Sequence, residues 1–276
     1  MRTAYPPHRL ELRRKVPPGS YLHQYKRNHY SQNGEDGVIL RIAELLEINT
    51  ARFVEFGAHN GIDMSNCRNL LLNHGWCGVF IEGNQTLFSD LLRNYYGNSD
   101  VLLLNYYVSG HAQSDESLDN ILKKHSVPTQ DIEIVSIDVD SIDYHIFDSI
   151  HGFNPSLYII EFNPTIANDI YFVQANTSEV MQGCSLLALT ELARQKQYEL
   201  VAVVGANAFF VRIDLFPKLG LSDNSIDNLY APSYDGRLFC GFDSYIHTLG
   251  LPVLHWSGVS IDSSDIQVHP DWRIQR

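Results

Sequence analysis

Strands and helices alternate along most of this chain, and that order limits the folds open to it. Apolar segments of strand length, each separated from the next by apolar residues at helical spacing, lie at 52–56, 78–82, 101–108, 132–138 and 157–162. Such strands pair in parallel, because a parallel pair needs a crossover connection that a helix supplies. Two more strands, 198–204 and 208–213, have three residues between them and must form an antiparallel hairpin.

These elements predict an α/β fold with a doubly wound seven-stranded sheet, mostly parallel with a terminal antiparallel hairpin. We expect helices on both faces of the sheet and the last strand beside the fifth. The folded domain is predicted to span 31–216 and to begin with a helix behind a Ser31 cap. It follows a basic N-terminal arm at 1–30, whose charge and two proline pairs indicate a solvated tail. It precedes a C-terminal extension at 217–276, whose aromatic and polar residues suit a sugar acceptor; the alternative is that they form a packed extension.

Charge is distributed unevenly along the chain. Residues 1–30 contain seven Lys or Arg and one Glu, which leaves 13 basic and 31 acidic residues in the remainder, a net charge of −18. A body this acidic is a poor match for nucleic-acid phosphates. No apolar run is long enough to cross a bilayer, and the N-terminus lacks a signal-type apolar stretch, so we expect a cytoplasmic protein without membrane contacts.

The first strand ends in a carboxylate and a glycine-containing turn. Glu55 precedes Gly57 and Gly61, a spacing that differs from the G-x-G-x-x-G of dinucleotide-binding turns, so NAD and FAD are disfavoured. In a parallel sheet, ligands bind beyond the carboxyl ends of the strands, near the first strand. Glycines there let a small ligand lie against the backbone, while Glu55 either accepts a hydrogen bond from an ammonium group or orders the loop.

A second acid, Glu82, ends the next strand. A carboxylate at that place can accept hydrogen bonds from both hydroxyls of a ribose. Two acids and a glycine turn on adjacent strands suit a nucleoside that carries an amino acid and no phosphate. S-adenosylmethionine fits that description.

Acids also follow the fourth and fifth strands, where a methyl acceptor would have to lie. Asp138 and Asp140 follow the fourth strand, and Glu161 and Asn163 follow the fifth; together they offer oxygen ligands that suit Mg²⁺. The alternative is that Asp138 and Asp143 order a turn and cap the following helix while Glu161 binds substrate hydroxyls directly. Beyond the fifth strand, the long irregular stretch 163–176 lies where we expect an acceptor-binding loop.

Two histidines are candidates for the general base of a transfer to a hydroxyl. His145 is the first, because its ordinary pKa lies near neutrality. His59, within the glycine turn, is the second.

Five segments resemble the FkbM-type family of S-adenosylmethionine-dependent methyltransferases, which have the class I methyltransferase fold: "SQNGEDGVILRI", "VEFGAHNGIDMSNCRNLLLNHGWCGVFIEGN", "ESLDNIL", "IVSIDVDSIDYHIFDSI" and "LYIIEFNPTI". The resemblance covers about residues 30 to 213. It implies that Glu55, Gly57 and Gly61 line the methionine part of the cofactor, that Glu82 binds the ribose, and that Ser109 lies at the adenine. One departure is Asp138-Val-Asp140-Ser141, where many members carry a D-V-E-G type segment.

Together these features predict an S-adenosylmethionine-dependent O-methyltransferase. Its acceptor would be a hydroxyl of a saccharide or small natural product that meets Asp138, His145 and Glu161. The second hypothesis is a non-catalytic binding module that keeps a methyltransferase-like fold. A homo-oligomer and a role for Mg²⁺ remain open at this stage.

Overall fold

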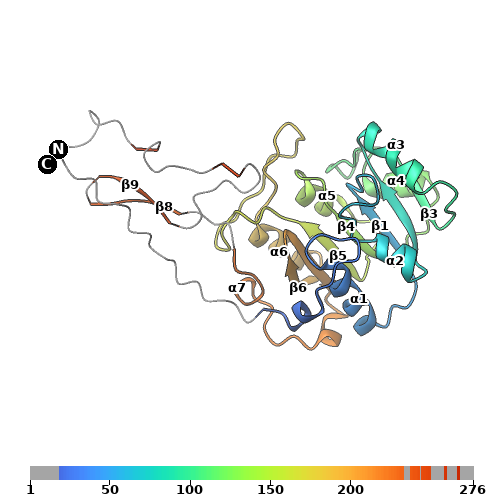
Figure 1. Cartoon of the computed structure of the whole chain (residues 1–276), viewed down its shortest axis with the longest axis horizontal. Coiled ribbons are helices and arrows are strands. Elements are labelled where there is room, and N and C mark those ends of the chain that lie inside the picture. Colours follow the sequence, from blue (N-terminus) through green and yellow to red (C-terminus); the bar gives the residue numbers. More distant parts are fainter. Residues whose placement is uncertain (1–18, 233–236, 243, 250–257, 260–265, 268–276) are drawn as a thin grey trace.

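A seven-stranded sheet forms the centre of the molecule (Figure 1). The computed structural model describes residues 19–232, 237–242, 244–249, 258–259 and 266–267. The strands are β1 (Arg52–Phe56), β2 (Cys77–Ile81), β3 (Val101–Leu104), β4 (Ile132–Ile137), β5 (Leu157–Glu161), β6 (Tyr198–Val204) and β7 (Asn207–Arg212). They lie in the order β3-β2-β1-β4-β5-β7-β6, and β7 runs antiparallel to the other six strands. The predicted class I methyltransferase topology is therefore confirmed, including the insertion of the last strand beside the fifth.

Helices cover both faces of the sheet, as predicted. They are α1 (Glu35–Leu46), α2 (Arg68–Asn73), α3 (Gln85–Asn94), α4 (Leu118–Lys124), α5 (Asp143–Ser149) and α6 (Leu186–Gln195). Buried side chains of α1, α2 and α3 share one apolar cluster with one face of the sheet, and those of α4, α5 and α6 share a second cluster with the other face. The period-2 alternation of each strand divides its side chains between the two clusters.

The first helix begins later than predicted. Gly34 rather than Ser31 is the N-cap residue of α1. The Ser31 hydroxyl instead hydrogen-bonds Asn28 and Asp36, and one Asp36 oxygen accepts the backbone N–H groups of residues 29, 30 and 31. A buried carboxylate with three backbone donors holds the preceding loop against the helix.

The N-terminal segment is part of the domain from residue 19 onward, earlier than the predicted boundary at residue 31. The 3-10 helix η1 (Tyr21–Tyr25) buries Leu22 completely, and Tyr21 Oη donates to the carbonyl of Leu219. The backbone N–H of Gly19 donates to the carbonyl of Asn228. Residues 19–34 therefore join the sheet to the chain beyond β7, and only residues 1–18 of the predicted arm lie outside the described residues.

The predicted C-terminal extension contains η2 (Phe216–Leu219), α7 (Ile226–Leu229) and the antiparallel pair β8 (Arg237–Cys240) and β9 (Ile246–Leu249). Leu219 and Leu229 are buried in the two apolar clusters, so the chain as far as α7 packs on the domain. Much of the aromatic-rich sequence after residue 232 lies outside the described residues. Within the described part of the chain, no helix has the length and apolarity required to span a membrane.

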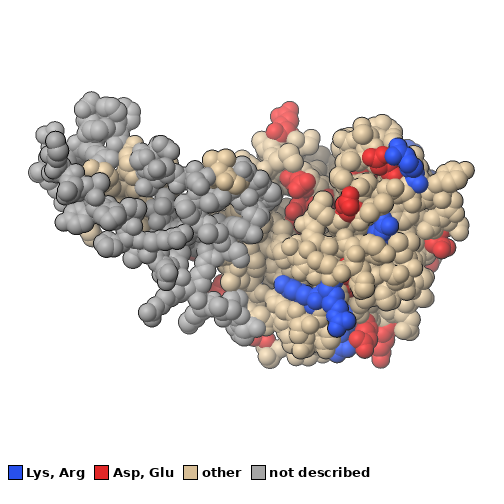
Figure 2. Space-filling model, in the orientation of Figure 1, with Lys and Arg blue, Asp and Glu red and all other residues tan. Residues whose placement is uncertain are grey.

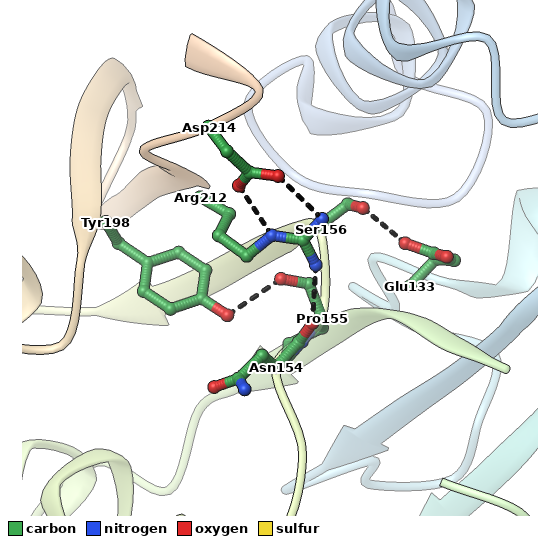
Figure 3. A network of polar contacts seen from close by, with 7 residues as sticks. All are labelled: Glu133, Asn154, Pro155, Ser156, Tyr198, Arg212 and Asp214. Carbon is green, nitrogen blue, oxygen red and sulfur yellow. Dashed lines mark hydrogen bonds and ion pairs between the residues drawn. The ribbon is translucent and has the colours of Figure 1, made fainter. Parts of the chain in front are cut away.

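A polar network closes the sheet at the amino ends of its parallel strands (Figure 3). Arg212, at the end of β7, pairs with Asp214 at 2.7 Å and donates to the carbonyl of Asn154 at 2.8 Å. Tyr198 Oη donates to the carbonyl of Pro155 at 2.8 Å. These groups satisfy one another within the chain, and their role is to tie β7 and β6 to the loop before β5.

Candidate functional site

A cleft of about 1530 Å³ lies at the opposite edge of the sheet, beyond the carboxyl ends of the parallel strands. It is lined by the residues that follow β1, β2, β3, β4 and β5 and by the turn between β6 and β7. Four of the predicted site residues, Glu55, Glu82, Asp138 and Glu161, reach it from four different strands. This is the edge at which parallel sheets bind ligands.

Gly57 brings the ends of β1 and β4 together. Its φ is 71°, and a Cβ built on it would lie 1.5 Å from the carbonyl oxygen of Asp138. The neighbouring strands are hydrogen-bonded at this point, from Asp138 N to the carbonyl of Phe56. Only glycine permits both this conformation and this approach, so the turn sets the floor of the cleft between the two predicted halves of the site.

Glu55 orders the loop after β1. Its buried carboxylate accepts hydrogen bonds from Ser65 Oγ at 2.8 Å and from the backbone N–H groups of Asn66 and Cys67, both at 2.9 Å. Burial raises the pKa of Glu55, while these hydrogen bonds oppose that shift. Of the two roles that the sequence left open for Glu55, loop ordering is the one the structure shows.

Gly61 is not among the residues that line the cleft, although the resemblance placed it at the methionine part of the cofactor. A Cβ on it would lie 2.4 Å from Leu91 and 2.5 Å from Tyr95, both in or next to α3. Its carbonyl accepts from Tyr95 Oη and Arg68 Nη1. Gly61 therefore lets the loop after β1 pack on α3. It contributes to the cleft indirectly, by holding that loop in place.

Glu82 has the position that a ribose-binding carboxylate requires. It follows β2, lines the cleft and is 7% exposed. One oxygen accepts from the backbone N–H of His59 at 2.8 Å, and the other accepts from that of Asn84 at 2.7 Å. Each carboxylate oxygen has two lone pairs, so both keep one acceptor site for a ligand while the two amides fix their direction.

The third strand ends at Leu104, earlier than the predicted residue 108. Asn105 leaves the sheet, and its side-chain amide donates to the carbonyls of Glu82 and Gly83. The strand therefore gives way to a loop that brings Tyr107 and Ser109 to the cleft. The Tyr107 ring is 71% exposed and lies against Gly83, where a Cβ would be 2.3 Å from the ring. Sequence reasoning missed Tyr107 because it counted this residue within the strand.

Three carboxylates meet at the ends of β4 and β5. Asp138, Asp140 and Glu161 each offer one oxygen within 4.8 Å of the others. Asp138 and Glu161 also hydrogen-bond each other, which requires one of the two to be protonated. Burial first, and repulsion by neighbouring carboxylates second, raise the pKa of both groups, so the pair shares one proton.

Asp143 holds the turn between β4 and α5, as the alternative reading of this segment predicted. Its carboxylate accepts from the backbone N–H groups of Val139 at 2.8 Å and Ser141 at 3.0 Å. Burial raises the pKa of Asp143 to about 6. Within the segment that departs from the D-V-E-G pattern, Asp140 takes a left-handed conformation with φ of 58°.

His145 does not have the position expected of a general base. Its Nε2 lies 2.8 Å from the carbonyl oxygen of Gln174, and since a carbonyl only accepts, Nε2 carries the hydrogen. The residue is not among those that line the cleft. In this position His145 holds the loop between β5 and α6.

Asn163 is likewise directed away from the carboxylates. Its Oδ1 accepts from the N–H and hydroxyl of Thr165, and its Nδ2 donates to the carbonyl of Gln182 at 2.9 Å. It does not line the cleft. The predicted set of metal ligands is therefore reduced to Asp138, Asp140 and Glu161.

His59, the second candidate for the base, does line the cleft, and its φ is 51°. Its Nδ1 is buried and has no hydrogen-bond partner in the described part of the chain.

Three segments complete the walls of the cleft. The loop after β5, where an acceptor-binding loop was expected, contributes Pro164 and the range 176–178. The N-terminal segment contributes His23 and Lys26, and the C-terminal extension contributes Leu229 to Ala231. The length of the loop after β5 had indicated a role at the site. The proline and charge content of the N-terminal segment had indicated a solvated tail instead.

No family model matches the chain, and no curated protein matches it. Solved structures that it resembles include TrmK from M. capricolum in complex with S-adenosyl-homocysteine, at 13% identity over 62% of this chain and 66% of that chain, with a TM-score of 0.38. Another is a TehB-like SAM-dependent methyltransferase from Corynebacterium glutamicum (11% identity, 69% of this chain, 92% of that chain, TM-score 0.39). A third is M. jannaschii TYW2 in complex with AdoMet (16% identity, 68% of this chain, 80% of that chain, TM-score 0.36).

Proposed function

We propose that this chain is an S-adenosylmethionine-dependent methyltransferase of the FkbM type that methylates a hydroxyl of a saccharide or small natural product. One observation carries the proposal. A single cleft joins the glycine turn and Glu82, which suit a nucleoside donor, to the proton-sharing pair of Asp138 and Glu161, which suits removal of a proton from an acceptor. The two halves meet where Gly57 contacts the Asp138 carbonyl.

The donor half fits a nucleoside without phosphates. Glu82 has an acceptor site free on each oxygen for the ribose hydroxyls, and Tyr107 offers an exposed ring beside Ser109 for a purine. Among the described residues that line the cleft, Lys26 is the only Lys or Arg, against seven Asp and Glu. Phosphate groups are usually bound by Arg, Lys or helix N-termini, so this composition favours S-adenosylmethionine over a dinucleotide.

The acceptor half supplies a base. Bound S-adenosylmethionine would supply a methyl group on a sulfonium centre, and the protein must place the acceptor oxygen in line with it. The Asp138 carboxylate accepts the hydroxyl proton, while protonated Glu161 hydrogen-bonds Asp138 and orients it. A raised pKa makes Asp138 a better base at neutral pH than an ordinary aspartate.

A divalent cation is the alternative way to relieve repulsion within the carboxylate cluster. Asp138, Asp140 and Glu161 are oxygen ligands of the type that Mg²⁺ prefers, and a bound cation would lower the pKa of an acceptor hydroxyl. Dialysis against EDTA distinguishes the two arrangements. With the shared proton, turnover survives the dialysis; with Mg²⁺, turnover is lost and returns when Mg²⁺ is added.

The acceptor is proposed to be small and rich in hydroxyl groups. Carboxylates accept hydrogen bonds from hydroxyls, and they repel the phosphates of nucleic acids. The apolar Leu229 and Met181 and the aromatic Tyr230 in the same cleft give a surface against which a sugar ring or a small aromatic product can pack.

Isothermal titration with S-adenosylmethionine and S-adenosylhomocysteine tests the donor assignment. We expect both to bind at a single site; absence of binding by either would reject the enzyme hypothesis. Transfer of labelled methyl groups to a panel of sugars and small phenols then separates the enzyme from a non-catalytic binding module. Binding of the donor without transfer in any buffer or metal condition would favour the module.

A further inference from the structure

Lys26 is the only Lys or Arg among the described residues that line the cleft. Every other charged Lys, Arg, Asp or Glu side chain among its described lining residues is acidic, and Glu55, Glu82, Asp138 and Glu161 form its floor. The amino-acid part of S-adenosylmethionine carries a carboxylate, which this acidic surface would repel. A cation is needed to offset that repulsion, and the cleft offers one.

The backbone of Lys26 is held firmly. Its N–H donates to the carbonyl of His23 as the C-cap of η1, and the next residue, Arg27, exchanges backbone hydrogen bonds with Gly34 and Gly37. Gly34, with φ of 107°, packs so closely that a Cβ on it would lie 2.6 Å from the Cβ of Lys26. The origin of the lysine side chain is therefore fixed, and only its flexible end moves.

The segment that carries Lys26 adjoins the loop after β1, where the methionine part of the donor is proposed to lie. The side-chain amide of Gln32 donates to the sulfur of Met64, and the guanidinium of Arg68 lies 4.7 Å from the centre of the Tyr30 ring. Gln32 and Met64 both line the cleft. Lys26 and the loop that begins at Gly57 therefore line the same cleft, and Gln32 and Met64 connect the two segments.

Lys26 has no ion-pair partner within 4.0 Å among the residues that the structure describes. Burial lowers its pKa, and Glu35 only partly opposes that effect. The Glu35 oxygens instead accept from the amides of Asn33 and Asn207. Lys26 is exposed by its accessible surface, so its ammonium is free to meet a ligand, and an anion brought by the ligand would stabilise its charged form. On the face of the molecule shown in Figure 2, Lys and Arg side chains gather over the N-terminal segment and α1.

We propose that Lys26 binds the carboxylate of the amino-acid part of S-adenosylmethionine and so distinguishes it from nucleosides that lack this group. The inference rests on the proposed function and adds a donor-binding residue that lies outside the predicted sites. A carboxylate on the acceptor is the competing occupant. The contact between Gln32 and Met64, on the loop that begins at Gly57, favours the donor.

The test compares two ligands that differ in the amino acid. S-adenosylhomocysteine carries the carboxylate, whereas 5′-methylthioadenosine has the same nucleoside and thioether without it. We expect Lys26→Ala to weaken binding of S-adenosylhomocysteine about tenfold and to leave that of 5′-methylthioadenosine unchanged, as measured by isothermal titration. The loss should diminish as salt concentration rises, and Lys26→Arg should retain most of the affinity.

Arg27→Ala is the matched control, because it removes the same charge from the adjacent residue, which does not line the cleft. It should leave both affinities unchanged. Alanine at position 26 keeps the Cβ that packs on Gly34, and a thermal melt verifies the fold. Equal losses for the two ligands, or an unchanged affinity for S-adenosylhomocysteine with a raised acceptor KM, would overturn the assignment of Lys26. Failure of the unaltered protein to bind either ligand would reject the proposed function instead.

Discussion

Replacement of Gly57 by alanine is the sharpest test of how the cleft is built. The substitution adds a single methyl group at a backbone position with φ of 71°. That methyl would lie 1.5 Å from the carbonyl oxygen of Asp138 and 2.7 Å from its carbonyl carbon. Ordinary contact between such atoms is roughly 3.5 Å, so β1 and β4 would have to separate by about 2 Å at the cleft.

Two costs add at this position. The left-handed conformation costs a non-glycine residue about 1–2 kcal/mol, which the lower entropy of the unfolded chain offsets in part. The clash is with backbone, which cannot rotate away, and separation of the strands also removes the hydrogen bond from Asp138 N to the Phe56 carbonyl at 3.3 Å. Overpacking costs about 1–3 kcal/mol, and a lost backbone hydrogen bond costs about 1 kcal/mol. We therefore expect Gly57→Ala to lower the free energy of unfolding by about 3–4 kcal/mol.

Gly75→Ala is the control, because Gly75 has nearly the same φ, 69°, and a Cβ on it meets nothing within 4 Å. It should lower the free energy of unfolding by about 1 kcal/mol or less. Urea unfolding followed by circular dichroism measures both variants. Equal losses would refute the argument, since they would mean that the approach of β1 to the Asp138 carbonyl contributes nothing beyond the glycine conformation.

Three further predictions concern the chemistry of the cleft. Glu82→Ala should weaken S-adenosylhomocysteine binding at least tenfold, because the ribose and two backbone amides lose their acceptor; an unchanged affinity in isothermal titration would remove the ribose assignment. Asp138→Asn should reduce turnover about hundredfold with little change in donor affinity. Because the pKa of Asp138 is raised, the rate of the unaltered enzyme should fall as pH drops through a midpoint above the usual aspartate value of about 4; a rate that stays flat to pH 4 would argue against this base. His145→Phe should reduce kcat much less than Asp138→Asn, because its Nε2 is bound to the Gln174 carbonyl; an equal reduction would restore His145 as the base.

The acidic residues at the ends of β2, β4 and β5 could be found from sequence because each follows a recognisable strand. The period of apolar residues locates a strand end to within a few positions, and parallel strands bring their carboxyl ends to one edge. Glu82, Asp138 and Glu161 consequently line the cleft as predicted. The direction of a side chain beyond a strand end could not be predicted in this way, because it depends on partners that are distant along the chain.

His145, Asn163 and Gly61 illustrate that dependence. Each follows a strand end by eight residues or fewer, yet His145 bonds the Gln174 carbonyl, Asn163 bonds the Gln182 carbonyl, and Gly61 packs on α3. These contacts join positions 19 to 34 residues apart along the chain. The local pattern of apolar residues does not predict these contacts, because they form only after the loops have packed.

Local periodicity and backbone sterics were sufficient to predict the order of strands and helices, the parallel sheet with one antiparallel hairpin, and the glycine turn after the first strand. Which side chains enter the cleft depends instead on tertiary packing. The N-terminal segment, which has the composition of a tail, lines the cleft because Leu22 is buried and because Asp36 binds the loop before α1. Long-range packing also sets Lys26 among carboxylates from four strands, an arrangement that leaves no mark in the local sequence.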